Sequence, residues 1–330
     1  MWPYDIKEKS WPPRKLFFLD RDTIPASITI PTPNFVHQWI EYQSTSPEQV
    51  LERIYDADVV ISNKVYLGSD ILEQAKQVKH IAVAATGVNN VELDYCAQRG
   101  VTVTNVQGYA TQSVPEHVIA LLFTLMRNIP AYHDDIRNGE WQRQNKFCFF
   151  THPIQDIAHS TLGIIGSGAL GQATAALARA IGMNVQFSER KGVTQCREGY
   201  VTFERFLKTS DAIALLCPLT EETTNLIDSE ALSNMKSTAV LINTGRGGLV
   251  NEGDLVCALK ENHIAGAGVD VFTEEPAPQT NPLVENMDLP NLILTPHVAW
   301  GNRSSIEKLC EILVSNIEAV EHGKTQNRVV

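Results

Sequence analysis

The chain has 330 residues, of which 43% are hydrophobic and 20% are charged. This length exceeds the usual size of one hydrophobic core, so we expect two domains. The net charge of −11 argues against nucleic acid and against an anionic membrane as partners, because both favour basic surfaces. A small anionic substrate is compatible with this charge, since a local cationic pocket can lie inside an acidic protein.

Signals for membrane insertion, export and structural metal are missing from the sequence. The longest purely apolar stretch, Val118–Phe123, is far shorter than a membrane span. Met1–Asp5 lacks the basic and apolar stretches of a secretory signal. The six cysteines are scattered without a CxxC pair, as is typical of reduced thiols. We therefore expect a cytoplasmic protein without a metal site.

The first hundred residues alternate strand and helix signals. Apolar and β-branched runs predict four strands, at residues 15–19, 58–61, 80–84 and 101–104. Helices are predicted from Ser46 to Tyr55 and from Leu72 to Val78. Such alternation is typical of a parallel sheet covered by helices.

A long helix and a second set of strands follow. Ser113 and Glu116 form a predicted capping box at the start of this helix, which has an apolar face. Six strands are predicted after it, at residues 162–165, 185–188, 212–217, 239–243, 268–272 and 292–295. Their regular order predicts a doubly wound parallel sheet of the Rossmann type.

The last segment is again helical, with a predicted capping box at Ser304 and Glu307. A helix placed after the last strand can return to pack on the first domain. We therefore expect an α/β protein with two doubly wound parallel-sheet domains, in which a Rossmann domain is inserted into a flavodoxin-like domain. The predicted boundaries are 1–107 with 298–330 for the discontinuous domain and 108–297 for the inserted one.

A glycine-rich turn predicts a dinucleotide site. Gly166, Ser167, Gly168, Ala169, Leu170 and Gly171 lie between the strand at 162–165 and a helix-forming stretch. In this pattern the first glycine permits a tight turn, the second lets the backbone approach a pyrophosphate, and the third lets helix and strand pack closely. The helix N-terminus adds free N–H donors for phosphate.

An acidic residue at the end of the next strand bears on the choice of dinucleotide. Glu189 lies 18 residues past Gly171, where a carboxylate accepts hydrogen bonds from ribose hydroxyls and repels a 2′-phosphate. This favours NAD. Arg190 and Lys191 leave NADP open, because either cation could hold the extra phosphate.

Three further residues predict the chemistry of hydride transfer to a carbonyl. Arg246 follows a strand within a glycine-rich loop, and a guanidinium can hold a carboxylate and a carbonyl. His297 follows another strand, and histidine exchanges protons near neutral pH. Glu275 is the predicted partner that orients this imidazole and favours its protonated form, with Glu274 as the competing candidate.

With these motifs the chain resembles the D-isomer-specific 2-hydroxyacid dehydrogenases. The family signatures are similar to 161–189, Asn243–Gly247, Asp270–Pro276 and Thr295–His297, and the separations from Arg246 to Glu275 and from Glu275 to His297 are 29 and 22 residues. The resemblance extends from about Phe17 to the C-terminal helix.

The resemblance implies further site residues. It places substrate-binding N–H groups at Thr86, Gly87 and Val88, and cofactor contacts at Cys217, Pro218, Thr244, Gly245 and Asp270. Leu216 departs from the family pattern, which often has histidine there. Trp300 resembles an aromatic residue of members that reduce hydroxypyruvate and glyoxylate, although core packing is an equal alternative.

The predicted function is NAD-dependent oxidation and reduction of a short D-2-hydroxyacid, as in a glycerate dehydrogenase that reduces hydroxypyruvate or glyoxylate. Arg246, Glu275 and His297 are the predicted catalytic residues, and a small 2-keto acid is the predicted ligand. Two alternatives stay open: a relative acting on phosphoglycerate or a bulkier keto acid, and a non-catalytic NAD-sensing interaction protein. The resemblance also implies a homodimer.

Overall fold

The computed structural model describes residues 12–330, which divide into two compact units. The first unit comprises the residues up to Tyr109 together with Asn302–Val330, and the second comprises Ala110–Gly301. The domain boundaries predicted from the sequence lie at 107/108 and 297/298 and stay a prediction.

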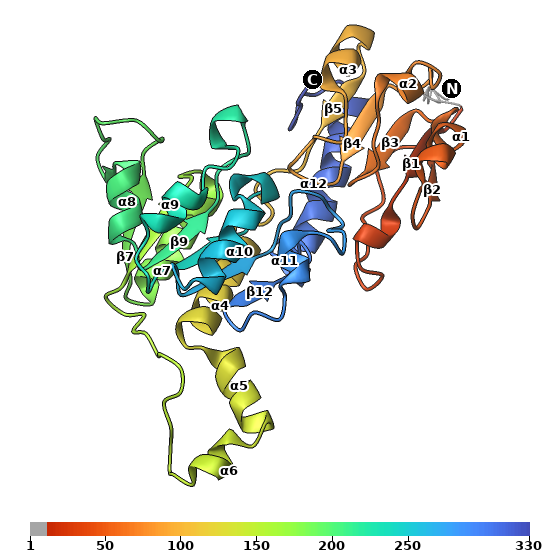
Figure 1. Cartoon of the computed structure of the whole chain (residues 1–330). Helices are drawn as coiled ribbons and strands as arrows, with labels where there is room; N and C mark the ends of the chain where they lie inside the picture. The colour runs from red at the N-terminus through yellow and green to blue at the C-terminus, as the bar shows by residue number, and fades with distance from the viewer. Residues whose placement is uncertain (1–11) are drawn as a thin grey trace, which may run out of the picture. The chain divides into compact units, whose positions relative to one another are not determined.

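The first unit is built on a five-stranded parallel sheet (Figure 1). Its strands are β1 (Arg14–Phe18), β2 (His37–Glu41), β3 (Val59–Ser62), β4 (His80–Val83) and β5 (Thr102–Thr104). They lie in the order β2-β1-β3-β4-β5, with Phe17 opposite Ile40 on one side and Val60 on the other. This is the flavodoxin-like order.

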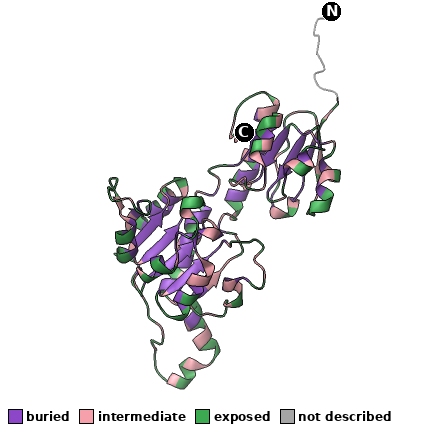
Figure 2. Cartoon of the chain, turned by 45° about the horizontal axis from the view of Figure 1, so that its top comes forward, coloured by how far each residue is buried: buried purple, intermediate pink, exposed green. Residues whose placement is uncertain are grey.

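The strands of this sheet differ in how clearly the sequence predicts them. β3 and β4 are buried along their whole length, as Figure 2 shows, and their apolar runs predict them well. β2 was not predicted, because it is an edge strand whose residues are half-buried or exposed. An edge strand needs an apolar contact on only part of its surface, so its sequence need not form an apolar run.

Within residues 12–330, four α-helices belong to the first unit: α1 (Val50–Ile54), α2 (Ser69–Leu72), α3 (Leu93–Arg99) and α12 (Arg303–Glu321). The helix predicted for 72–78 is wrong, since α2 ends at Leu72 and turns follow. α12 packs on β4, and its buried Asn316 donates a hydrogen bond to the carbonyl of Asn105 at 2.8 Å. Its N-cap is Asn302, whose side chain accepts from Ser305 N, and not the predicted Ser304.

The second unit contains a seven-stranded parallel sheet in the order β12-β11-β10-β9-β6-β7-β8. The strands are β6 (Thr161–Ile165), β7 (Asn184–Ser188), β8 (Tyr200–Val201), β9 (Ala212–Leu215), β10 (Val240–Asn243), β11 (Gly266–Val269) and β12 (Leu292–Leu294). All of the predicted strands are present, and the two-residue β8 adds an unpredicted edge. The order reverses between β6 and β9, which is where open parallel sheets bind ligands.

The helices of the second unit are α4 (Ser113–Met126), α5 (Ile129–Arg137), α6 (Glu140–Gln144), α7 (Ala169–Ala180), α8 (Phe203–Thr209), α9 (Ser229–Ser233), α10 (Glu252–Lys260) and α11 (Pro282–Glu285). α4 packs against α7, β10 and β11 through its apolar face. Gln112 is its N-cap instead of the predicted Ser113, whose hydroxyl donates to the carbonyl of Ala299 at 2.5 Å.

α5 and α6 extend from the end of α4 and project away from the sheet of the second unit (Figure 1). The two helices contact each other, and the chain returns through 145–160 to β6. We call residues 129–154 the arm. Within residues 12–330, no helix is both long enough and apolar enough to cross a membrane.

Candidate active site

The glycine turn after β6 is shaped by close backbone contacts. Gly166 has φ +107°, and a Cβ there would lie 2.6 Å from Cys217 N in the loop after β9. A Cβ on Gly171 would lie 1.9 Å from the carbonyl oxygen of Gly166. Only glycine fits either position, so the turn lets α7 begin directly beyond the carboxyl end of β6.

The space around this turn fits a dinucleotide. A Cβ on Gly168, the N-cap of α7, would meet no atom within 4 Å, so an approaching phosphate has room. Ser167, Ala169 and Leu170 bring their N–H groups to the same helix end, where unpaired donors favour an anion. The hydroxyl of Thr244 is buried and has no hydrogen-bond partner within residues 12–330, so it can bond to a ligand in this region.

Glu189 lies at the carboxyl end of β7, as predicted, but its carboxylate is already occupied. Oε1 accepts hydrogen bonds from the backbone N and Nε of Arg197, both at 2.8 Å, and Oε2 accepts from the guanidinium at 3.0 Å. These hydrogen bonds from Arg197 lower the pKa of Glu189. Arg197 was not predicted from the sequence, because it lies in a loop eight residues away with no motif around it.

Arg246 projects from the loop after β10. The buried Asn243 fixes this loop, donating from Nδ2 to Arg246 O at 2.9 Å and accepting from Gly245 N at 3.1 Å. The guanidinium donates to the carbonyl of Gly245, and no carboxylate in the described part of the chain pairs with it. A half-buried cation without a carboxylate is suited to bind an anionic ligand.

His297 and Glu275 form a direct pair. His297 Nδ1 lies 2.7 Å from Glu275 Oε2, and the other carboxylate oxygen accepts from Phe272 N at 3.0 Å. The structure thus places Glu275 on the imidazole, whereas Glu274, which is also exposed, makes no hydrogen bond or ion pair to residues 12–330. His297 Nε2 makes no hydrogen bond to residues 12–330 and is the ring atom left for a ligand.

Asp270 anchors the loop that carries His297. Its carboxylate is fully buried and accepts from the hydroxyl of Thr295 at 2.5 Å, from Val298 N at 2.9 Å and from Ala299 N at 2.9 Å. His117 of α4, which the sequence analysis missed, contacts the same Thr295 hydroxyl at 3.0 Å. Asp270 therefore orients the loop that carries His297.

Trp300 closes the same loop on itself. Its indole N–H donates to the carbonyl of His297 at 2.9 Å. His297 has φ +54°, a left-handed conformation that the surrounding hydrogen bonds maintain. The position of the imidazole is therefore determined by several contacts at once.

The loop after β9 lies beside the glycine turn. Leu216 donates its backbone N–H to Ile165 O at 2.8 Å, and its side chain cannot replace the hydrogen bond of the histidine often found there in the family. Cys217 is half-buried, and burial raises the pKa of its thiol to about 11. Pro218 follows at the surface.

In the first unit, the predicted substrate loop follows β4. The backbone N–H groups of Thr86, Gly87 and Val88 donate no hydrogen bond to residues 12–330, whereas Asn105 Nδ2 holds the carbonyl of Thr86 at 2.7 Å. Three successive free N–H groups on a fixed loop are suited to bind a carboxylate.

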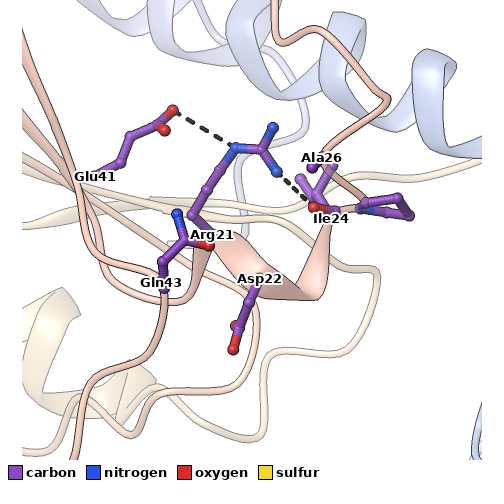
Figure 3. Close-up of a pocket in the computed structure, with 7 residues that line it drawn as sticks. Arg21, Asp22, Ile24, Ala26, Glu41 and Gln43 are labelled. Atoms are coloured by element: carbon purple, nitrogen blue, oxygen red, sulfur yellow. Dashed lines mark hydrogen bonds and ion pairs between the residues drawn. The ribbon is translucent and has the colours of Figure 1, made fainter.

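A separate hollow of about 350 Å³ lies at the carboxyl ends of β1 and β2 (Figure 3). Its Arg21 donates to Ile24 O at 2.5 Å and lies 3.6 Å from Glu41. This guanidinium is already paired within the first unit, and none of the predicted site residues lines the hollow. Groups of three or more His, Cys, Asp or Glu side chains arranged for a metal were not found within residues 12–330.

Comparison with known proteins decides the family. Residues 119–299 match the model of the "D-isomer specific 2-hydroxyacid dehydrogenase, NAD binding domain". The chain belongs to this family. Its second unit therefore contains the family's nucleotide-binding domain, and the protein is an oxidoreductase that depends on a nicotinamide dinucleotide.

Individual relatives span nearly the whole chain of this dehydrogenase. A glycerate dehydrogenase of Methylorubrum extorquens is 45% identical, covering 96% of this chain and 99% of the relative. A hydroxypyruvate reductase of Blautia hydrogenotrophica is 35% identical, covering 86% and 88%. The crystal structure of the TT0316 protein from Thermus thermophilus has a TM-score of 0.81 at 30% identity, covering 96% and 100%.

Proposed function

We propose that this dehydrogenase reduces hydroxypyruvate to D-glycerate and catalyses the reverse oxidation, with glyoxylate as a second small substrate. The observation that carries the proposal is the pairing of His297 Nδ1 with Glu275, which leaves Nε2 for a substrate oxygen. The relatives named above support the choice of substrate, because both act on three-carbon acids of this kind.

Each charged residue has one task in the proposed reduction. Protonated His297 donates its Nε2 proton to the carbonyl oxygen of the substrate, which becomes the hydroxyl. Glu275 holds the imidazole in place and stabilises its positive charge until the proton leaves. Arg246 binds the substrate's carboxylate and carbonyl. In the first unit, the free N–H groups of Thr86, Gly87 and Val88 are the proposed carboxylate-binding group. The bound dinucleotide supplies the hydride in reduction and accepts it in oxidation.

Trp300 is the proposed selector of short substrates. The indole donates a hydrogen bond to the backbone carbonyl of His297, so the ring is fixed within the loop that carries the imidazole. A fixed aromatic ring in this loop is proposed to disfavour a long side chain on C2 of the substrate. A bulky keto acid should therefore react poorly.

The test is the decay of NADH absorbance with purified protein and four keto acids: hydroxypyruvate, glyoxylate, pyruvate and 2-ketoisocaproate. We expect the highest kcat/KM with hydroxypyruvate and the lowest with 2-ketoisocaproate. Comparable values for 2-ketoisocaproate would contradict the role of Trp300. Measurable NADH binding without turnover of any keto acid would refute the proposed function.

The proposal includes a cytoplasmic homodimer. All six cysteines are free thiols, which supports a reducing compartment.

The arm bears six large apolar side chains that are exposed in the single chain: Ile129, Ile136, Trp141, Phe147, Phe150 and Ile154. Phe147 is 95% exposed and Phe150 is 77% exposed, and such a patch is typical of a protein–protein interface. We propose that a second copy of the chain covers it.

A further inference from the structure

The carboxylate that is expected to determine the preference for NAD over NADP is neutralised by a neighbouring cation. Glu189 is 6% exposed, and the three hydrogen bonds from Arg197 occupy both of its oxygens. The guanidinium of Arg197 also lies 3.8 Å from the centre of the Tyr200 ring. Arg197 is thus held from two sides, by a carboxylate and by an aromatic face.

This pairing changes what the second ribose of the cofactor meets. An isolated carboxylate accepts hydrogen bonds from the 2′- and 3′-hydroxyls and repels a 2′-phosphate. The carboxylate and the guanidinium together carry no net charge, so the pair does not repel the phosphate. The guanidinium has five N–H donors, of which Glu189 receives two, so three stay available for phosphate oxygens.

The other two cations of this region are less well placed to bind a phosphate. Arg190 and Glu222 are 3.7 Å apart with side chains that are 81% and 76% exposed, and Lys191 lies 3.6 Å from Asp228. The Arg190 pair is highly exposed, so ordering it costs entropy and salt screens it. Lys191 is less exposed, at 46%, and also lies 5.8 Å from the centre of the Phe203 ring, but its ammonium is a single point charge without the fork of donors that Arg197 offers. Arg197 is already ordered, although its side chain is 62% exposed to an approaching ligand.

We propose that Arg197 is a cofactor-specificity residue, which neutralises Glu189 and binds the 2′-phosphate of NADP(H). The enzyme accordingly accepts both dinucleotides. This inference rests on the proposed cofactor site, since it requires the adenosine ribose to lie beyond β7. It assigns the phosphate to Arg197 instead of Arg190 or Lys191.

The test is equilibrium binding of NADH and NADPH to the purified enzyme, followed by tryptophan fluorescence or calorimetry, without a keto acid. We expect the two dissociation constants of the unmodified enzyme to agree within about tenfold. Arg197→Gln should weaken NADPH binding about tenfold or more and leave NADH binding unchanged or tighter, because one charge-assisted contact to the phosphate is lost. Glu189→Gln should shift the ratio in the opposite direction, towards NADPH.

Two controls separate this role from a general effect of charge. Arg205→Gln removes an exposed cation of α8 and should leave the NADPH/NADH ratio unchanged. Arg190→Gln tests the competing cation and should change the ratio less than Arg197→Gln. The inference is overturned if Arg197→Gln leaves the ratio unchanged, if Arg190→Gln has the larger effect, or if the unmodified enzyme binds only NADH. Failure of NADH itself to bind would instead refute the cofactor site and the proposed function.

Discussion

At the scale of single residues, two adjacent carboxylates in the loop after β11 have different environments. Both residues are exposed, but Glu275 contacts His297 Nδ1 at 2.7 Å, whereas Glu274 makes no hydrogen bond or ion pair to residues 12–330. Glu275→Gln keeps the shape of the side chain but removes the charge that stabilises the imidazolium. We expect kcat for hydroxypyruvate reduction to fall about 100-fold or more.

The matched control for this substitution is Glu274→Gln, which should leave kcat within about twofold. Steady-state kinetics with NADH would measure both. If the two variants lost activity equally, the partner of His297 would be wrongly assigned.

Cys217 supplies a second test at this scale. With its pKa raised to about 11 by burial, only about one thousandth of this thiol is ionised at pH 8. We expect iodoacetamide to label the exposed Cys148 and Cys196 first, as followed by peptide mass spectrometry. Labelling of Cys217 at the same rate, or without any further slowing by NADH, would contradict its position beside the cofactor turn.

At the scale of elements, the sequence predicted the second unit more completely than the first. β6, β9, β10 and β11 are buried strands, so selection for an apolar interior leaves continuous apolar runs in their sequences. The edge strand β2 and the two-residue β8 lack such runs and could not be predicted from pattern alone.

The residues of the candidate site also differ in how well the sequence predicts them. His297, Glu275 and the glycine turn could be predicted because each follows a strand and belongs to a motif. Arg197 and His117 could not, because their roles come from side-chain contacts between segments that are separate in the sequence. Helix starts were mispredicted by one or two residues for a related reason: Gln112 and Asn302 compete with nearby serines as caps, and only packing decides between them.

The buried His80, at the start of β4, should make the folded protein less stable at acidic pH. It is buried and bonded through Nε2 to the hydroxyl of Thr104 at 2.8 Å, and burial lowers its pKa to about 3. The imidazole of His80 takes up a proton near pH 6.5 in the unfolded chain but not in the folded chain. The free energy of unfolding is therefore highest above pH 6.5 and decreases as the pH falls below it. From pH 7 to pH 5 the expected loss is about 2 kcal/mol from this group alone.

Urea unfolding of the enzyme and of His80→Gln at both pH values would measure this contribution. The difference between pH 7 and pH 5 should be smaller in the variant by about that amount. His133→Gln, which changes an exposed histidine, should behave like the unmodified enzyme. Equal pH dependence in all three proteins would show that His80 does not titrate in this way.

At the scale of the whole molecule, the arm should determine the oligomeric state. One chain has a mass of 36.6 kDa, and sedimentation velocity at micromolar concentration should show a species of about twice that mass. Replacing Phe147 and Phe150 together by serine should shift the population towards the monomer, because the most exposed apolar area is lost. Met287→Ser, which changes an exposed apolar side chain outside the arm, should have no effect. A monomeric unmodified enzyme would refute the proposed dimer.

In the proposed reaction, His297 transfers the proton to and from the substrate oxygen. The most direct measurement is single-turnover reduction of hydroxypyruvate by His297→Asn, with NADH binding to the same preparation measured in parallel. We predict that NADH binds nearly as tightly as to the unmodified enzyme while the rate of reduction falls about 1,000-fold or more. A variant that binds NADH and still reduces hydroxypyruvate at a comparable rate would contradict this role of His297.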